Sequence, residues 1–98
     1  MIEEITVEEL MEMQDKKEDF ILLDVREESE YEESNIDGSV LVPLSEFDDR
    51  IQDFDKDKAY VVHCKMGGRS ARAVAAMLDL GFENVKNLEG GIEAWITQ

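Results

Sequence analysis

The 98-residue sequence contains one cysteine, Cys64, and one histidine, His63. A single cysteine cannot form an intrachain disulfide, and one cysteine with one histidine cannot supply the four ligands of a structural zinc site. The fold must therefore be held by its hydrophobic core, and a chain of this length suits one core rather than two. We expect one domain spanning residues 1–98, with no metal and no cofactor.

Long apolar runs are also missing. The longest covers residues 73–78, six residues, whereas a helix that spans a bilayer needs about 20. The chain starts Met-Ile-Glu-Glu, without the basic region that opens a signal peptide. These features predict a cytoplasmic protein that does not bind membranes.

Positive charge is scarce, since 10 Lys and Arg face 25 Asp and Glu and the net charge is −15. Such an acidic protein repels nucleic-acid phosphates and anionic lipids, so we exclude both as partners. The charge is unevenly spread: residues 1–57 carry −16 and residues 79–98 carry −3, but residues 58–78 contain no acid and carry +4. Cys64 lies inside this basic window.

Short apolar segments alternate with helix signals along the chain. The segments typical of buried parallel strands cover residues 20–23, 39–42, 59–63 and 84–88. Helices are predicted for residues 7–15, 27–34, 45–54, 70–80 and 92–97, the first behind a capping box formed by Thr6 and Glu9. This alternation predicts an α/β fold with a parallel sheet and helices on both faces.

Cys64 has the position of a functional residue in such a sheet. Ligands bind outside the carboxyl ends of parallel strands, and Cys64 directly follows the predicted strand 59–63. The loop Lys-Met-Gly-Gly-Arg then leads into the next helix. Gly67 and Gly68 allow the backbone to curl so that successive N–H groups point inward and bind an anion.

The surroundings of Cys64 also predict a reactive thiol. The helix that begins at Ser70 and the guanidinium of Arg69 would place positive charge beside the sulfur. Such neighbours lower a thiol pKa from about 8.5 to roughly 3.5–7.5, which predicts a thiolate nucleophile. The alternative interpretation makes Cys64 a small buried residue that closes its strand. His63 points to the opposite face of its strand, so we expect a partly buried strand residue rather than a general base.

Taken in order and spacing, the motifs of the chain resemble those of single-domain rhodaneses, a family of sulfurtransferases. The resemblance runs from residue 5 to residue 95. The motifs that carry it include Leu-Asp-Val-Arg-Glu from residue 23, Val-Pro-Leu from residue 42, Cys-Lys-Met-Gly-Gly-Arg-Ser from residue 64, and Leu-Glu-Gly-Gly-Ile-Glu-Ala-Trp from residue 88. The loop is most similar to that of rhodanese domains fused to adenylyltransferases, which supply sulfur for molybdopterin or thiamine.

The resemblance implies a five-stranded parallel sheet and a persulfide mechanism. Cys64 would take the outer sulfur of a small anionic donor such as thiosulfate and pass it to cyanide, a thiol or a sulfur-carrier protein. Asp24 and Arg26 would support the loop from the end of a neighbouring strand. The residues expected to hold the persulfide or the donor are Lys65, Met66, Gly67, Gly68, Arg69 and Ser70, with Lys65 and Arg69 binding the anion.

Two details separate this chain from related patterns. It has Ser-Asn-Ile at residues 34–36 where the family often has Gly-His-Ile. Four residues separate Cys64 from Arg69, whereas phosphatases of the same fold have one more, so the loop has the compact form associated with sulfur.

The competing hypotheses are a persulfide carrier with little thiosulfate activity, an inert binding module and a phosphatase. We expect a monomer whose acidic surface could bind a basic protein partner.

Overall fold

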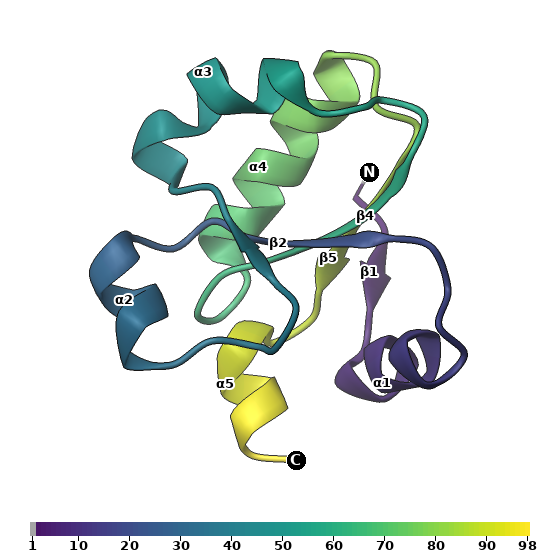
Figure 1. The fold of residues 1–98 in the computed structure, drawn as a ribbon, viewed down its shortest axis with the longest axis vertical. Helices are drawn as coiled ribbons and strands as arrows, with labels where there is room; N and C mark the ends of the chain where they lie inside the picture. Colours follow the sequence, from purple (N-terminus) through teal and green to yellow (C-terminus); the bar gives the residue numbers. More distant parts are fainter. Residues whose placement is uncertain (1) are drawn as a thin grey trace.

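The computed structural model describes residues 2–98 as a parallel sheet with helices packed on both faces (Figure 1). The strand order within these residues is β1-β5-β4-β2-β3, and every neighbouring pair is parallel. The strands are β1 (Glu4–Ile5), β2 (Ile21–Asp24), β3 (Val40–Leu41), β4 (Ala59–His63) and β5 (Asn84–Leu88). This order confirms the predicted fold class, and it puts β4, which Cys64 follows, in the middle of the sheet.

The helices divide between the two faces of the sheet (Figure 1). One face is covered by α1 (Val7–Asp15) and α5 (Gly91–Ile96), and the other by α3 (Phe47–Arg50) and α4 (Gly68–Asp79). The remaining helix, α2 (Glu28–Glu33), lies at the carboxyl end of β2, beside the loop that follows β4. Within residues 2–98, no helix is long and apolar enough to cross a membrane.

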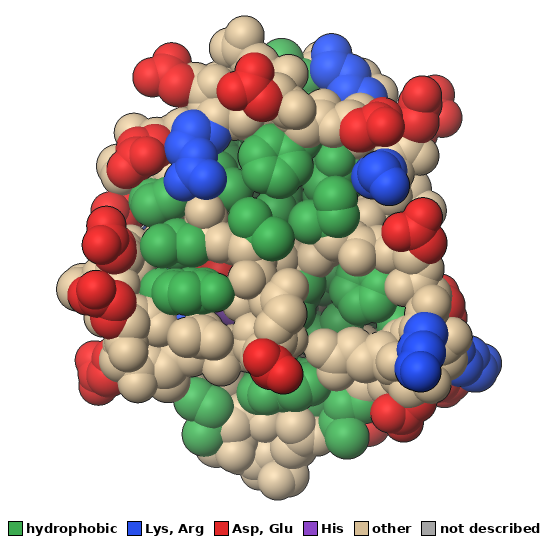
Figure 2. All heavy atoms as spheres, viewed as in Figure 1, with side chains coloured by type: hydrophobic (Ala, Val, Ile, Leu, Met, Phe, Trp, Pro, Cys, Tyr) green, Lys and Arg blue, Asp and Glu red, His purple; other side chains and the backbone are tan. Residues whose placement is uncertain are grey.

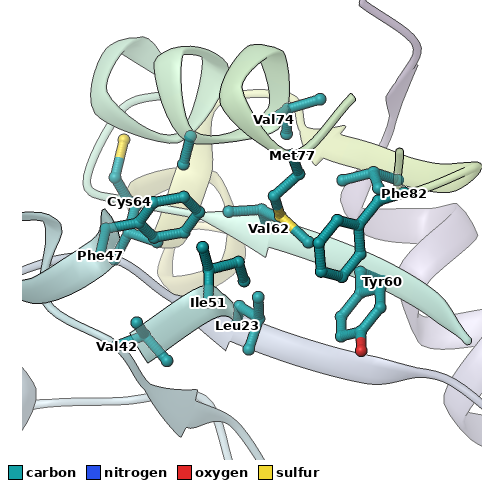
Figure 3. Close-up of a cluster of buried hydrophobic side chains, with 13 residues drawn as sticks. Leu23, Val42, Phe47, Ile51, Tyr60, Val62, Cys64, Val74, Met77 and Phe82 are labelled. Atoms are coloured by element: carbon teal, nitrogen blue, oxygen red, sulfur yellow. The ribbon is translucent and has the colours of Figure 1, made fainter. Parts of the chain in front are cut away.

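Both faces of the sheet are buried, as the continuous apolar strands predicted. In β2, Leu22 packs with the α1 and α5 side, while Leu23 packs with the α3 and α4 side. The same alternation separates Val61 from Val62 in β4. Figure 3 shows the cluster on the α3 and α4 side, which includes Cys64 at one end. The catalytic candidate is therefore anchored in the core rather than carried by a free loop.

Several element boundaries differ from the prediction. Residues 45–54 form a short α3 between two 3₁₀ turns, Leu44–Glu46 and Ile51–Asp53, instead of one helix. Only Phe47 and Ile51 of these elements are buried, one turn apart, and so little packing stabilises no more than a short α-helical turn. The two-residue β1 was missed because it is too short to show a periodic pattern.

The start of α4 also differs, and this difference affects the site. The helix begins at Gly68 rather than Ser70, with Gly67 as its N-cap at φ +122°. Glycine suits that left-handed backbone conformation because it has no Cβ. Arg69 is consequently part of the first helical turn rather than of the loop.

Candidate active site

The sulfur of Cys64 lies against the first turn of α4 (Figure 3). The residue is 1% exposed. The backbone N–H of Gly67 donates a hydrogen bond to Sγ at 3.1 Å, and the hydroxyl of Ser70 lies 3.4 Å from Sγ. The curled loop thus surrounds the sulfur with hydrogen-bond donors supplied by residues three and six positions later in the chain.

These donors change the acidity of the thiol. Burial by itself raises the pKa of Cys64, but hydrogen bonds from the Ser70 hydroxyl and from the backbone N–H groups of Ser70, Gly67 and Met66 lower it by more. The net pKa of the thiol lies below its ordinary value. The thiolate is stabilised by dipoles that point at it, which is the arrangement that favours a buried nucleophile.

The other side of the loop is held by α5. The backbone N–H groups of Ile92 and Glu93 donate to the carbonyl oxygens of Cys64 (2.9 Å) and Lys65 (3.1 Å). Gly91 lies so close to this loop that a Cβ atom there would be 2.5 Å from the Lys65 oxygen and 2.6 Å from the Cys64 oxygen. Its φ of +60° also favours glycine. Gly91 is therefore part of the support of the active loop.

A polar contact that the sequence analysis missed lies behind Ser70. The Ser70 hydroxyl has one proton and two acceptors, Oδ1 of Asn87 at 2.5 Å and Sγ of Cys64 at 3.4 Å, so it donates to one of them at a time. Asn87 is 1% exposed in β5. Nδ2 of Asn87 donates to Oε2 of Glu4 at 3.0 Å, which fixes which way the amide faces. The available signal was an asparagine inside a predicted buried strand, because asparagine is depleted in strands.

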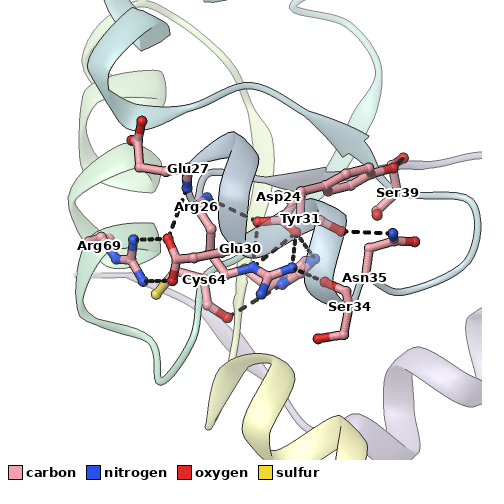
Figure 4. Close-up of polar contacts among 11 residues, drawn as sticks. Asp24, Arg26, Glu27, Glu30, Tyr31, Ser34, Asn35, Ser39, Cys64 and Arg69 are labelled. Carbon is pink, nitrogen blue, oxygen red and sulfur yellow. Dashed lines mark hydrogen bonds and ion pairs between the residues drawn. The ribbon is translucent and has the colours of Figure 1, made fainter.

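Both cations expected to bind the donor are paired with carboxylates. The two terminal nitrogens of Arg69 contact the two carboxylate oxygens of Glu30 at 2.8 and 2.9 Å (Figure 4). The hydrogen bonds from Arg69 lower the pKa of Glu30 to about 2. Lys65 has its Nζ 3.8 Å from Oε1 of Glu93. The basic window of the sequence therefore faces acids from α2 and α5, which are distant in sequence and so escaped the charge analysis.

Asp24 and Arg26 form a buried ion pair at the end of β2 (Figure 4). The Arg26 guanidinium donates to both carboxylate oxygens of Asp24, the shortest contact being 2.7 Å, and the backbone N–H of Arg26 adds another at 2.9 Å. Nη2 of Arg26 also donates to the carbonyl of Ser34 at 2.7 Å. Among the described residues, no hydrogen bond joins this pair to residues 64–70. It fixes the carboxyl end of α2, the helix that carries Glu30.

His63 is buried between the ion pair and the active loop. Its Nδ1 is 3.4 Å from the carbonyl oxygen of Cys64, and its Nε2 is 3.8 Å from Oδ2 of Asp24. Burial lowers the pKa of His63, although the charge of Asp24 acts in the opposite direction. Within residues 2–98 it makes no hydrogen bond to the sulfur of Cys64, so the structure gives it no position as a base for that thiol.

Comparison with known proteins decides the family. The family model of the rhodanese-like domain matches residues 6–98. The chain belongs to the rhodanese-like domain family. A sulfurtransferase of Allochromatium vinosum is 34% identical to this rhodanese-like domain over 95 residues, which cover 97% of the chain and 89% of that protein. The resemblance inferred from the motifs is confirmed, and the domain belongs with the rhodanese-like sulfurtransferases.

The chain is also similar to part of a larger protein and to a solved structure. The probable adenylyltransferase/sulfurtransferase MoeZ of Mycobacterium tuberculosis is 38% identical over 96 residues, which cover 96% of this chain but only 24% of MoeZ. The chain thus spans about a quarter of that relative. The crystal structure of a rhodanese-related protein from Thermoplasma volcanium superposes with a TM-score of 0.88 at 36% identity, covering 97% of this chain and 91% of that one.

The surface beside the active loop of the rhodanese-like domain is partly apolar. Beside the active loop lies a hollow of about 700 Å³ whose lining includes Met66, Glu93, Ala94 and Ile96. The side chain of Met66 is directed into solvent at 68% exposure, so its contribution to the sulfur comes from its backbone. In the face shown in Figure 2, most acidic side chains lie along the periphery, together with several Lys and Arg side chains, around exposed hydrophobic ones.

Proposed function

We propose that this rhodanese-like domain carries sulfane sulfur as a persulfide on Cys64. It takes the sulfur from thiosulfate or from a persulfide donor and passes it to a thiophilic acceptor such as cyanide, a thiol or a sulfur-carrier protein. The observation that carries the proposal is the buried Sγ within hydrogen-bond distance of Gly67 N–H and the Ser70 hydroxyl. These donors stabilise the thiolate before the reaction and can hold the negative sulfur of the persulfide after it.

The reaction takes place at this thiolate in two steps. The Cys64 thiolate attacks the outer sulfur of thiosulfate, the bond between the two sulfurs of thiosulfate breaks, and sulfite leaves with the bonding electron pair. In the second step an acceptor thiolate attacks the terminal sulfur of the persulfide, and the Cys64 thiolate is the leaving group. Total charge is conserved in each step, and the low thiol pKa makes Cys64 both available as a nucleophile and a good leaving group.

The loop size supports sulfur transfer over phosphate chemistry, and the name of a relative supports thiosulfate as a donor. Four residues between Cys64 and Arg69 form a small ring around the sulfur, which suits one sulfur atom better than a tetrahedral phosphate. A relative in Coxiella burnetii, 31% identical over 80 residues that cover 82% of this chain, carries the name thiosulfate sulfurtransferase GlpE.

The test is sulfur loading followed by intact-mass measurement. We expect the reduced protein to gain the mass of one sulfur atom after incubation with thiosulfate, and to lose it on addition of cyanide as thiocyanate is released. The Cys64→Ser variant is the matched control and should gain nothing. If the protein gains no sulfur from thiosulfate or from a persulfide, or if the variant gains the same mass, the proposal is wrong.

A second candidate is a persulfide carrier that uses thiosulfate poorly. The pairing of Arg69 with Glu30 favours it, because this pairing occupies the terminal nitrogens of the guanidinium that would otherwise bind a small anion beside the loop. A relative in Bacillus subtilis, 35% identical over 94 residues, is named as a putative sulfur carrier protein, YrkF. Loading of Cys64 by cysteine persulfide without loading by thiosulfate would identify a carrier, whereas equal loading by both would identify a thiosulfate sulfurtransferase.

A further inference from the structure

The guanidinium nearest to the reactive loop is already occupied. The two terminal nitrogens of Arg69 donate hydrogen bonds to the two carboxylate oxygens of Glu30, at 2.8 and 2.9 Å. A guanidinium and a carboxylate match each other in this paired geometry, and the same nitrogens would be needed to bind the sulfonate oxygens of thiosulfate. A donor that requires Arg69 must therefore displace Glu30.

Glu30 is not a mobile surface carboxylate. Its Oε1 also accepts a hydrogen bond at 2.9 Å from the backbone N–H of Glu27, the N-cap of the same helix. The far end of that helix is tied to the buried pair of Asp24 and Arg26 through the carbonyl of Ser34. The negative charge is permanent as well, since contact with Arg69 keeps the pKa of Glu30 at about 2.

The neighbouring hollow adds no free positive charge. It measures about 250 Å³, and its lining includes the carboxylates of Glu30, Glu33 and Glu93. The two cations in the same lining are both paired, Arg26 with Asp24 at 2.7 Å and Lys65 with Glu93 at 3.8 Å. A donor approaching through this hollow meets carboxylates whose charge opposes each negative charge that it carries.

We propose that Glu30 is a specificity-determining residue, which makes the site select singly charged sulfane-sulfur donors, such as persulfides, over doubly charged thiosulfate. This inference rests on the proposed persulfide chemistry of Cys64 and narrows its donor class. The Cys64 thiolate already carries one negative charge, so each further charge on the donor adds repulsion that only the loop N–H groups and the paired cations offset.

Two donors that react at the same kind of sulfur–sulfur bond but differ in net charge can separate the effect of donor charge from the effect of donor reactivity. Thiosulfate is a dianion and releases sulfite, whereas methanethiosulfonate is a monoanion and releases methanesulfinate. In both reactions the Cys64 thiolate attacks the outer sulfur, the bond from that sulfur to the oxidised sulfur breaks, and the leaving group departs with the electron pair. The persulfide product is identical, so the ratio of the two kcat/KM values reports the first step alone.

The variant Glu30→Gln removes the charge while keeping the shape. Glutamine can still accept the hydrogen bond from Glu27 N–H, as glutamine does in capping boxes. The matched control is Glu33→Gln, which removes one charge from the same helix and the same hollow at an exposed side chain without an ion pair in the described structure. The Glu30→Ala variant repeats the test without relying on the glutamine side chain.

We expect Glu30→Gln and Glu30→Ala to raise kcat/KM for thiosulfate about tenfold relative to methanethiosulfonate. The control Glu33→Gln also removes a charge from the hollow but releases no guanidinium, and its exposed charge is screened by solvent and salt, so it should shift this ratio less than about twofold. An unchanged or lower ratio in both Glu30 variants, or an equal rise in the control, overturns the inference while leaving the proposed function intact. Failure of both donors to load the unmodified protein would instead refute the proposed function, and this inference with it.

Discussion

Two buried acidic groups end neighbouring strands of the sheet, and the protein stabilises them in opposite ways. Asp24 ends β2 and is 0% exposed, and Cys64 follows β4 and is 1% exposed. Asp24 is neutralised by a full positive charge, because Arg26 contacts both of its oxygens. The sulfur of Cys64 is instead surrounded by neutral dipoles, from Gly67 N–H and the Ser70 hydroxyl.

The difference separates a structural group from a reactive one. A carboxylate that is paired with a guanidinium uses its oxygens to accept the hydrogen bonds of that group. It is therefore not available to react with a substrate. A thiolate stabilised by dipoles retains its net charge and remains a nucleophile, while the dipoles also suit the charge that moves onto the outer sulfur. The same sheet edge thus contains one acid that holds the fold and one that reacts.

The largest expected effect comes from breaking the buried ion pair of Asp24 and Arg26. Replacing Arg26 with Met leaves the Asp24 carboxylate buried and without its counter-charge, so we expect the free energy of unfolding to fall by about 3–5 kcal/mol. Denaturant unfolding measures this change. As a matched control, Arg50→Met removes an exposed pair with Glu46 at 3.9 Å and should cost less than about 1 kcal/mol. If the free energy of unfolding falls by similar amounts in the two variants, burial of the pair does not make its loss more destabilising.

An intermediate effect is expected from removing one dipole at the reactive centre. Ser70→Ala takes away the hydroxyl beside Sγ, so the thiol pKa should rise towards its ordinary value. Because hydrogen bonds to charged groups contribute about 1.5–3 kcal/mol, alkylation of Cys64 by iodoacetamide near neutral pH should slow about tenfold. The pH profile of alkylation checks this, with Ser45→Ala, on the exposed surface, as control. If the pH profile of Ser70→Ala is the same as that of the unmodified protein, Ser70 does not stabilise the thiolate.

The smallest effect concerns His63, which lies between the two centres. Its pKa is lowered in the folded state by burial, so the unfolded chain binds the proton first as pH falls. Its stabilising contribution is present above the unfolded pKa of about 6.5 and is lost as pH falls from there through the lower folded pKa. We expect a stability slope of at most about 1.4 kcal/mol per pH unit from this group. Unfolding of His63→Gln between pH 5 and 7 should lack this slope, and an identical slope in the variant would contradict the prediction.

Much of the fold could be predicted from local sequence patterns. The capping box of Thr6 and Glu9 forms as expected, with hydrogen bonds of 2.9 and 3.1 Å. The apolar strands β2 and β4 are buried on both faces because their hydrophobic runs leave no polar side for solvent. The two-residue β1 could not be found in this way, since its pairing with Asn87 and Leu88 depends on residues at the other end of the chain.

The site was predictable in position but not in its charge balance. Cys64 and its loop follow from the junction of a strand, glycines and a helix start, all of which are local signals. The partners of Arg69 and Ser70 are Glu30 and Asn87, which lie 39 and 17 residues away in sequence. Only the fold brings these residues together, and it pairs two of the four cations in the +4 window, Lys65 and Arg69, with carboxylates that lie far away in sequence.

The contacts between α5 and the active loop set an order in which the site can form. The loop carbonyls of Cys64 and Lys65 are bonded by Ile92 and Glu93, and Gly91 leaves the room for that contact. On the ribosome, the residues of the loop emerge before those of α5. A growing chain therefore already contains the thiol while lacking the helix that fixes its surroundings. We therefore expect the loop to reach its final conformation around the thiol only once α5 has been synthesised and has packed against it.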